Sequence, residues 1–214
     1  MISTEEQRRL SEELVRECRG YSERDNKPDG AYIKEKERFF NLFKIKRLIE
    51  AGANVSVKNN IGQPPLHWIE SVEIAKYLIF SGADVNAEDG QGSTSLDWAI
   101  WRDSIEVANF LISVGANVNS KNNIGKSPLH DVKSVALAKL LISAGADVNT
   151  KDITGWTPLY TAVNRNNVAV AEYLISAGAN VNAKTNSGTS ILYWATLWGY
   201  KEIEALLKRH GATL

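Results

Sequence analysis

The 214-residue sequence has few of the side chains from which metal centres and nucleophilic sites are built. Its only cysteine, Cys18, can form neither an internal disulfide nor a multi-cysteine metal site, and it suits a reducing compartment. A zinc centre needs several converging ligands, and the three histidines, His67, His130 and His210, have no such companions. We therefore expect no disulfide, no metal centre and no cofactor.

The sequence also lacks an excess of charge of one sign, and it lacks long apolar runs. Lys plus Arg equals Asp plus Glu at 25 each, so no net charge draws the chain toward nucleic acid or an anionic membrane. No run of 18 apolar residues occurs, and the N-terminus MISTEEQRRL has no apolar signal region. We expect a soluble, cytoplasmic protein that makes no membrane contact, although export by a machinery that needs no classical signal is compatible with the same sequence.

What the chain does contain is a repeated pattern, seen best in residues 152–184, DITGWTPLYTAVNRNNVAVAEYLISAGANVNAK. Thr157 suits the N-cap of a helix and Pro158 suits its first position, where no amide hydrogen is needed. A second helix is predicted from apolar residues at helical spacing, and Gly178 ends it. The pattern predicts a turn followed by two short helices, which need neighbours to bury their apolar faces.

The same pattern recurs along the sequence. Glycines that end a second helix stand 30 or 33 residues apart, at Gly52, Gly82, Gly115, Gly145, Gly178 and Gly211. First helices begin with variants of T-P-L-H: PPLH at 64–67, TSLD at 94–97, SPLH at 127–130, TPLY at 157–160 and SILY at 190–193. Over residues 39–214 the sequence resembles the ankyrin repeat family. The resemblance implies an all-α ankyrin-repeat solenoid of helix-turn-helix units with β-turn or hairpin tips.

The repeat boundaries predict the domain organisation. Residues 1–20 are expected to form an extra amphipathic helix that caps the first repeat, with a partner-binding helix as the alternative. Residues 21–58 would hold a connection and a degenerate first repeat. Five full repeats follow, at 59–88, 89–121, 122–151, 152–184 and 185–214. The last has a polar second helix, as a C-terminal cap needs, so we expect the chain to be complete at that end.

Two repeats, 59–88 and 122–151, lack three residues where the first helix should end. Three residues of α-helix span about 4.5 Å. The deletion therefore predicts either recessed first helices, which would notch the inner surface, or a tighter connection between the two helices of each short repeat.

Catalytic chemistry is not expected. His67 and His130 share one place in T-P-L-H, where the resemblance implies hydrogen bonds between neighbouring turns. Carboxylates such as Asp84, Asp147 and Asp152 recur with the repeat, which indicates turn chemistry. No nucleophile elbow or phosphate-binding glycine loop is present, and the glycines at 90 and 92 belong to a repeat turn. We expect no catalytic residues, so the chain is not predicted to be an enzyme.

The resemblance implies that a protein partner binds the concave side, formed by turn tips and first helices. Mapped onto this sequence, the predicted partner-binding residues are Trp101, Arg102, Lys126, Trp156, Asn164, Arg165 and Trp198. We expect Trp68, Trp98 and Trp194 to pack between repeats instead. The leading hypothesis is a non-catalytic, monomeric scaffold for protein–protein interaction. The alternatives are a small ligand or single-stranded nucleic acid bound by aromatic rings interleaved with cations, and a structural oligomer formed through the N-terminal helix.

Overall fold

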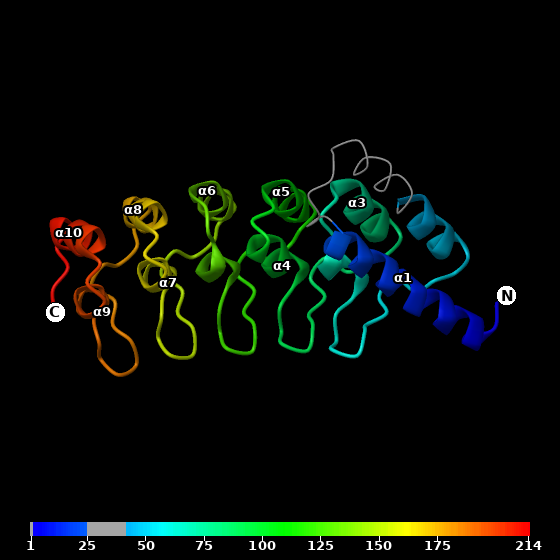
Figure 1. Cartoon of the computed structure of the whole chain (residues 1–214), viewed down its shortest axis with the longest axis horizontal. Coiled ribbons are helices and arrows are strands. Elements are labelled where there is room, and N and C mark those ends of the chain that lie inside the picture. Colours follow the sequence, from blue (N-terminus) through cyan, green and yellow to red (C-terminus); the bar gives the residue numbers. More distant parts are fainter. Residues whose placement is uncertain (1, 25–41) are drawn as a thin grey trace. The chain divides into compact units, whose positions relative to one another are not determined.

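Each full repeat folds into a hairpin-shaped turn followed by two helical segments (Figure 1). The two segments contact each other in the repeats at 59–88, 122–151, 152–184 and 185–214. The computed structural model describes residues 2–24 and 42–214, without the side chains of residues 19–24. It divides into two units. The N-terminal unit comprises Met1–Ala99 and Glu106–Ala116, and the C-terminal unit comprises Ile100–Ile105 and Asn117–Leu214.

The N-terminal unit starts with the extra helix α1 (Thr4–Arg24), which the hydroxyl of Ser3 caps by accepting from the amide of Glu6. The helix extends four residues beyond the predicted boundary at residue 20. Residues 42–50 are helical, and residues 25–41, which hold most of the predicted connection and degenerate repeat, lie outside the described residues. Further on are η1 (Pro65–Trp68), α3 (Val72–Phe80), the start of α4 (Ser95–Trp101) and most of α5 (Ile105–Ser113).

Helix α1 packs its apolar residues inside this unit. Leu14 and Cys18 are fully buried, and α1 contacts η1. The hydroxyl of Ser11 accepts a 2.9 Å hydrogen bond from the amide of Asn54. At the helix edge the Lys44 ammonium lies 2.6 Å from a carboxylate oxygen of Glu17. The apolar face of α1 is therefore used within the chain.

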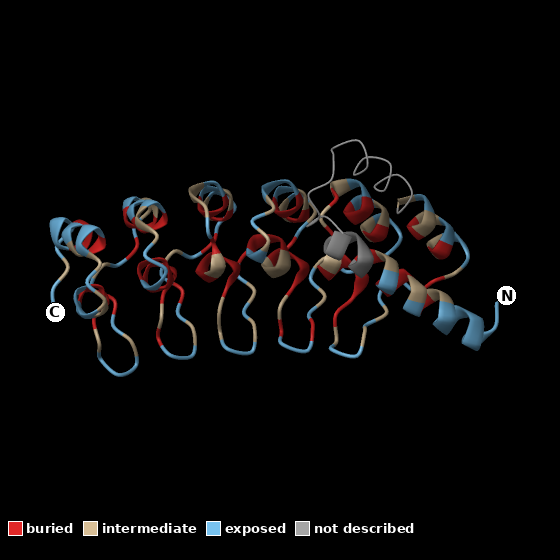
Figure 2. Cartoon of the chain, in the orientation of Figure 1, coloured by how far each residue is buried: buried red, intermediate tan, exposed pale blue. Residues whose placement is uncertain are grey.

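In the C-terminal unit the predicted helix starts are confirmed. The hydroxyl of Thr157 accepts from the amide of Tyr160, and Pro158 stands at the first helical position. Buried residues line the facing sides of the paired helices, while the hairpin tips are exposed (Figure 2). The elements are η2 (Pro128–Asp131), α6 (Val135–Ser143), α7 (Pro158–Asn164), α8 (Val168–Ser176), α9 (Ile191–Leu197) and α10 (Lys201–Arg209).

The first residue of each hairpin closes the turn with its side chain. A carboxylate oxygen of Asp152 accepts from the amides of Thr154, at 2.8 Å, and Trp156, at 2.9 Å. Equivalent bonds are made by Asn59, Asp89 and Asn122, and through a hydroxyl by Thr185. Asp84 and Asp147 likewise accept from the amides two residues on, those of Asn86 and Asn149. The recurring carboxylates therefore serve turn chemistry, as predicted.

The deletion in the short repeats falls within the first helix. The segments η1 and η2 are 3-10 turns of 4 residues, whereas α4, α7 and α9 are α-helices of 7 residues. Every repeat keeps three residues between its two helical segments, so the alternative of a tighter connection is wrong. Because a 3-10 turn rises about 2.0 Å per residue against about 1.5 Å, the short segments lose only about 2.5 Å of length.

The connection nevertheless differs between long and short repeats. In long repeats it passes through a left-handed residue, Asp103, Asn166 or Gly199. In short repeats the chain leaves the 3-10 turn in extended conformation, at Ile69 or at Val132 with ψ 137°. A completed α-helical turn is closed by a left-handed residue, whereas a single 3-10 turn runs directly into the next segment.

Helix α10 has the polar outer face predicted for the last repeat. The Glu204 carboxylate lies 2.7 Å from the Lys208 ammonium and 3.5 Å from that of Lys201. At the matching positions of α8, one repeat earlier, stand Ala171, which is fully buried, and Ile175, which is 9% exposed. Ion-paired side chains thus replace apolar ones on this face.

Candidate functional site

All seven predicted partner-binding residues belong to the C-terminal unit. Trp101, Asn164 and Arg165 are exposed, whereas the other four are half-buried, namely Arg102, Lys126, Trp156 and Trp198. Most of them lie in three groups. Trp101 forms the first, Lys126 and Arg165 lie around Asp131, and Trp156 and Trp198 lie around Tyr160.

Trp101 is the last residue of α4, and 57% of it is exposed. The last residues of the other long first helices are exposed as well: Asn164 ends α7, and Leu197, 59% exposed, ends α9. The Lys133 ammonium lies 5.0 Å from the centroid of the Trp101 ring and also donates to the Trp101 carbonyl. A cation over an aromatic face is attractive, so Lys133 holds the indole in place.

The second group bridges the short repeat 122–151. A guanidinium nitrogen of Arg165 lies 2.6 Å from a carboxylate oxygen of Asp131, and the Lys126 ammonium lies 4.0 Å from the same oxygen. Arg165 also donates to the Val132 carbonyl, and Nδ2 of the Asn167 side chain donates to the Lys133 carbonyl. Side chains of the following long repeat therefore reach across the shortened first helix.

Asp131 was not among the predicted site residues, although the sequence carries a signal for it. Three of the other full repeats have tryptophan at the matching position, namely Trp68, Trp98 and Trp194. The carboxylate partly neutralises Arg165 and Lys126, which leaves less positive charge for a phosphate than the sequence alone indicates.

The third group is an aromatic cluster in which Trp156, Trp194 and Trp198 surround Tyr160. The Trp156 and Tyr160 ring centroids are 4.0 Å apart, and Trp194 and Trp198 each lie 6.3 Å from Tyr160. Trp194 and Trp198 stack with centroids 5.3 Å apart. Two of the predicted binding residues, Trp156 and Trp198, are thus packed partly into this cluster.

Tyr160 is 2% exposed, and burial, followed by the nearby Asp152 carboxylate, raises the pKa of its hydroxyl to about 12. The hydroxyl therefore stays protonated. It is buried without a hydrogen-bond partner among the described residues, as is the indole Nε1 of Trp194. Tyr160 stands where T-P-L-H places histidine, and that substitution is the sequence signal for this cluster.

The two histidines of T-P-L-H link neighbouring hairpins, as the resemblance implied. Nε2 of His67 lies 3.0 Å from the Ser93 carbonyl, and Nε2 of His130 lies 3.0 Å from the Trp156 carbonyl. Nδ1 of His130 accepts from the amide of Ser127, so the neutral ring carries its proton on Nε2. Desolvation lowers the pKa of His130 and outweighs its bond to the Trp156 carbonyl.

The tryptophans expected between repeats are found there. Trp68 and Trp98, from consecutive repeats, stack with centroids 6.3 Å apart, and Trp194 joins the Tyr160 cluster. All three are half-buried, so they pack between repeats without being fully enclosed.

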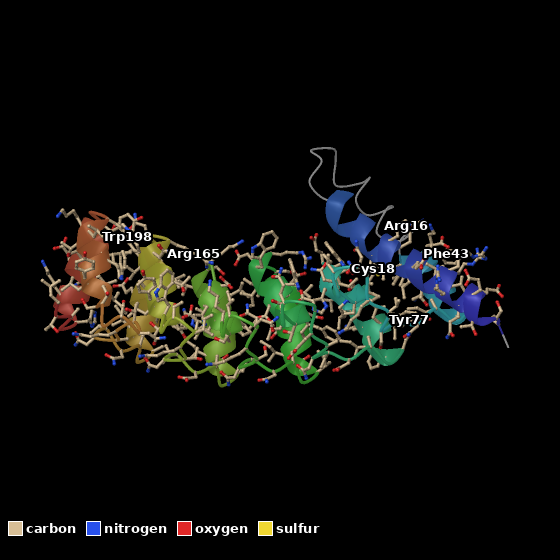
Figure 3. All side chains as sticks on the ribbon, turned by 90° about the horizontal axis from the view of Figure 1, so that it is seen from below. Arg16, Cys18, Phe43, Tyr77, Arg165 and Trp198 are labelled. Atoms are coloured by element: carbon tan, nitrogen blue, oxygen red, sulfur yellow. The ribbon has the colours of Figure 1, made fainter. Side chains whose placement is uncertain are left out.

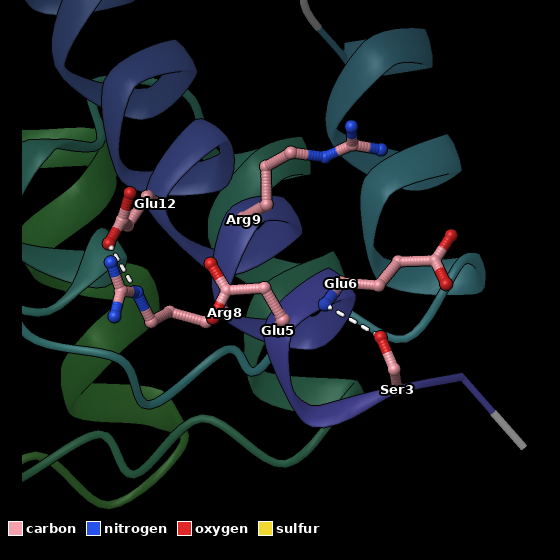
Figure 4. Close-up of a pocket in the computed structure, with 6 residues that line it drawn as sticks. All are labelled: Ser3, Glu5, Glu6, Arg8, Arg9 and Glu12. Carbon is pink, nitrogen blue, oxygen red and sulfur yellow. Dashed lines mark hydrogen bonds and ion pairs between the residues drawn. The ribbon is translucent and has the colours of Figure 1, made fainter.

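Other candidate sites lie along α1. A shallow pocket of about 390 Å³ is lined by alternating charges, among them the ion pair of Arg8 with Glu12 (Figure 4). Its lining is Ser3, Glu5, Glu6, Arg8, Arg9 and Glu12, which are exposed residues of one helix end.

Burial raises the pKa of the Cys18 thiol, which keeps it neutral and poorly nucleophilic. Among the side chains that the structure describes, in residues 2–18 and 42–214, no three His, Cys, Asp or Glu gather as metal ligands.

Among the described helices, none is long and apolar enough to cross a membrane.

A family model described as ankyrin repeats in three copies matches residues 38–122 and 125–214. No curated protein matches the chain.

Two solved structures are similar to the chain. The ankyrin repeat domain of Bcl-3, a member of the IkappaB protein family, has a TM-score of 0.72 and 29% identity, covering 82% of this chain and 83% of that one. A chain from the complex of the predatory endopeptidase Bd0816 of Bdellovibrio bacteriovorus with immunity protein Bd3460 has a TM-score of 0.72 and 22% identity, covering 79% and 92%. The predicted all-α ankyrin-repeat solenoid fold is confirmed, and the chain belongs to the ankyrin repeat family.

Proposed function

We propose that this chain is a non-catalytic protein-binding module whose partner lies on the first helices and hairpins of the C-terminal unit. Ankyrin repeats generally serve as non-enzymatic modules that bind proteins. The proposed surface contains Trp101, Arg102, Lys126, Trp156, Asn164, Arg165 and Trp198, to which we add Leu197. We further propose a cytoplasmic location, which the single buried thiol of Cys18 supports.

One observation carries the proposal: Trp101 is 57% exposed and Leu197 is 59% exposed at the same position of two long repeats. Large side chains left in water at matched positions are typical of interaction surfaces, and tryptophan is enriched among interface hot spots. Trp101 is also held over the Lys133 ammonium, so little side-chain freedom remains to be lost on binding.

The alternatives have weaker support. Phosphate recognition needs available cations, yet Arg165 and Lys126 already lie close to Asp131. Self-association through α1 needs an apolar face, yet Leu14, Val15 and Cys18 are buried within the N-terminal unit. Both observations favour a protein partner at the C-terminal unit.

The test is capture of a partner by the parent chain and by a Trp101→Ala, Leu197→Ala double variant, followed by an affinity measurement. Because both side chains are exposed, we expect the melting temperature to be unchanged and the affinity to fall at least tenfold. Trp156 and Trp198 are unsuitable here, since removing either would disturb the Tyr160 cluster.

Phe80→Ala is the matched control, because Phe80 is 83% exposed on a second helix. It should leave capture unchanged. Equal affinities of the parent and the double variant would contradict the proposed surface.

A further inference from the structure

The Tyr160 cluster, composed of Trp156, Tyr160, Trp194 and Trp198, holds two donors that the described part of the protein does not satisfy. The Tyr160 hydroxyl and the Trp194 Nε1 are both buried without a hydrogen-bond partner there. Buried polar groups nearly always have partners, and an exception calls for an explanation. The two donors belong to neighbouring rings of one cluster, whose centroids are 6.3 Å apart.

The packing of the repeats does not explain the Tyr160 hydroxyl. At the same position His130 joins its hairpin to the next through a bond to the Trp156 carbonyl. Tyr160 makes no such bond, and its ring lies against Trp156 instead. At this position, tyrosine therefore lacks the stabilising hydrogen bond that histidine makes, and its hydroxyl is a donor that remains unused beside aromatic rings.

Trp198 packs against both rings that carry the unsatisfied donors, with centroids 6.3 Å from Tyr160 and 5.3 Å from Trp194. It follows the end of α9 immediately, is half-buried, and stacks on Trp194 at an interplanar angle of 30°. Rotation of this half-buried indole would uncover part of the cluster, and Leu197 and Tyr193 of α9 are already exposed. Figure 3 shows Trp198 and Arg165 on adjacent repeats, and both belong to the proposed binding surface, so the cluster forms part of that surface.

The chemistry of the cluster selects the ligand. Aromatic faces favour apolar rings, and the two donors need acceptors. The same donors point their positive ends at a ligand and thereby disfavour a cation such as an alkylated ammonium. A proline-rich segment matches both demands, because its residues lack amide hydrogens, its carbonyls have no internal partners, and its rings stack on aromatic grooves.

We propose that the Tyr160 cluster binds a proline-rich, polyproline II segment of the partner protein. A proline ring would pack against Trp194 after Trp198 turns aside, and backbone carbonyls would accept from the Tyr160 hydroxyl and the Trp194 Nε1. The proposal rests on the proposed protein-binding function and specifies the chemistry of the partner.

The experiment titrates the parent chain with a synthetic decaproline peptide and follows tryptophan fluorescence, with a glycine-serine decamer as the control peptide. Tyr160→Phe removes only the buried hydroxyl. We expect it to weaken decaproline binding about 3- to 10-fold while its melting temperature stays equal or rises by up to about 4 °C. Tyr193→Phe is the matched variant, because Tyr193 occupies the same T-P-L-H position in the next repeat, on α9, but is 48% exposed. Its loss of a hydroxyl should change affinity less than about twofold.

Three results would overturn the inference. The first is no binding of decaproline by the parent up to millimolar peptide, or equal binding of both decamers. The second is unchanged decaproline affinity in Tyr160→Phe. The third is a lower melting temperature of Tyr160→Phe, which would show that a buried water already satisfies the hydroxyl. If decaproline fails while the Trp101 and Leu197 double variant loses its partner, the protein-binding function stands and only this inference falls.

Discussion

Gly155 forms the contact through which one hairpin tip rests on the next, and replacing it with alanine tests how much that contact stabilises the repeats. Gly155 has φ +85°, and an added Cβ would lie 2.7 Å from the backbone nitrogen of Asn186. Asn186 also joins the two hairpins, donating from its amide to the Thr154 carbonyl and from its side chain to the Ile153 carbonyl. The new methyl group must therefore displace this hydrogen-bonded segment.

Gly178 is the matched control, because it lies in the same repeat with φ +94° and nothing within 4 Å of an added Cβ. Alanine at either position must adopt the left-handed conformation, which costs about 1–2 kcal/mol. At Gly155 the displacement adds the loss or distortion of two hydrogen bonds, each contributing about 0.5–1.5 kcal/mol. Gly155→Ala should therefore lower the free energy of unfolding by about 1–3 kcal/mol more than Gly178→Ala.

Urea unfolding followed by circular dichroism measures this difference, and a lower melting temperature, about 2–4 °C for each kcal/mol, gives an independent reading. Since repeat arrays can unfold in parts, hydrogen exchange of the Asn186 amide supplies a local measure. Its protection should fall in Gly155→Ala and persist in Gly178→Ala. Equal destabilisation by both substitutions, with the Asn186 amide still protected, would refute the role given to the hairpin contact.

Two further predictions concern bonds between repeats. The Asn149 side chain donates to the Gly178 carbonyl and accepts from the Asn180 amide, so Asn149→Ala should lower the free energy of unfolding by about 1–2 kcal/mol in urea unfolding, whereas Asn164→Ala, at an exposed helix end, should not. The lowered pKa of His130 means that the unfolded chain takes up the proton first, so stability present above pH 6.5 should be lost as pH falls below that value. Melting curves at stepwise lower pH should show this loss in the parent and not in His130→Gln, and a parent curve independent of pH would contradict the assignment.

The repeat period and the helix starts could be predicted from the sequence because each is set by residues close to one another in the chain. Thr157 and Pro158 fix the start of α7 by local capping, and the hairpins are closed by side chains two to four residues away. The choice between a shortened helix and a shortened connection was open, because three missing residues can be absorbed by either. The observed 3-10 turns with extended exits settle it in favour of the helix.

The grouping of the candidate site could not be predicted, because it depends on side chains that meet across repeats. Arg165 was predicted to bind a partner, and its pairing with Asp131, 34 residues earlier, is not evident from the sequence pattern. Trp156 and Trp198 were expected on the exposed side, but Tyr160 draws both into a cluster. A tyrosine in place of the histidine of T-P-L-H leaves the helix start unchanged and changes only the contacts that this side chain makes. The repeat period of the sequence is therefore the same with either residue.

At the last residue of each long first helix, the requirements of folding can be distinguished from those of binding. Trp101, Asn164 and Leu197 share this position and differ in size and polarity, and all three are exposed. A position that buries so little surface places few demands on residue type, and substitutions there change stability within about 0.5 kcal/mol. Folding therefore gives no reason for a tryptophan or a leucine at this place. Their presence is accounted for if a partner removes them from water. Because the short repeats end their first segments before this position, we expect such a partner to contact the long repeats there.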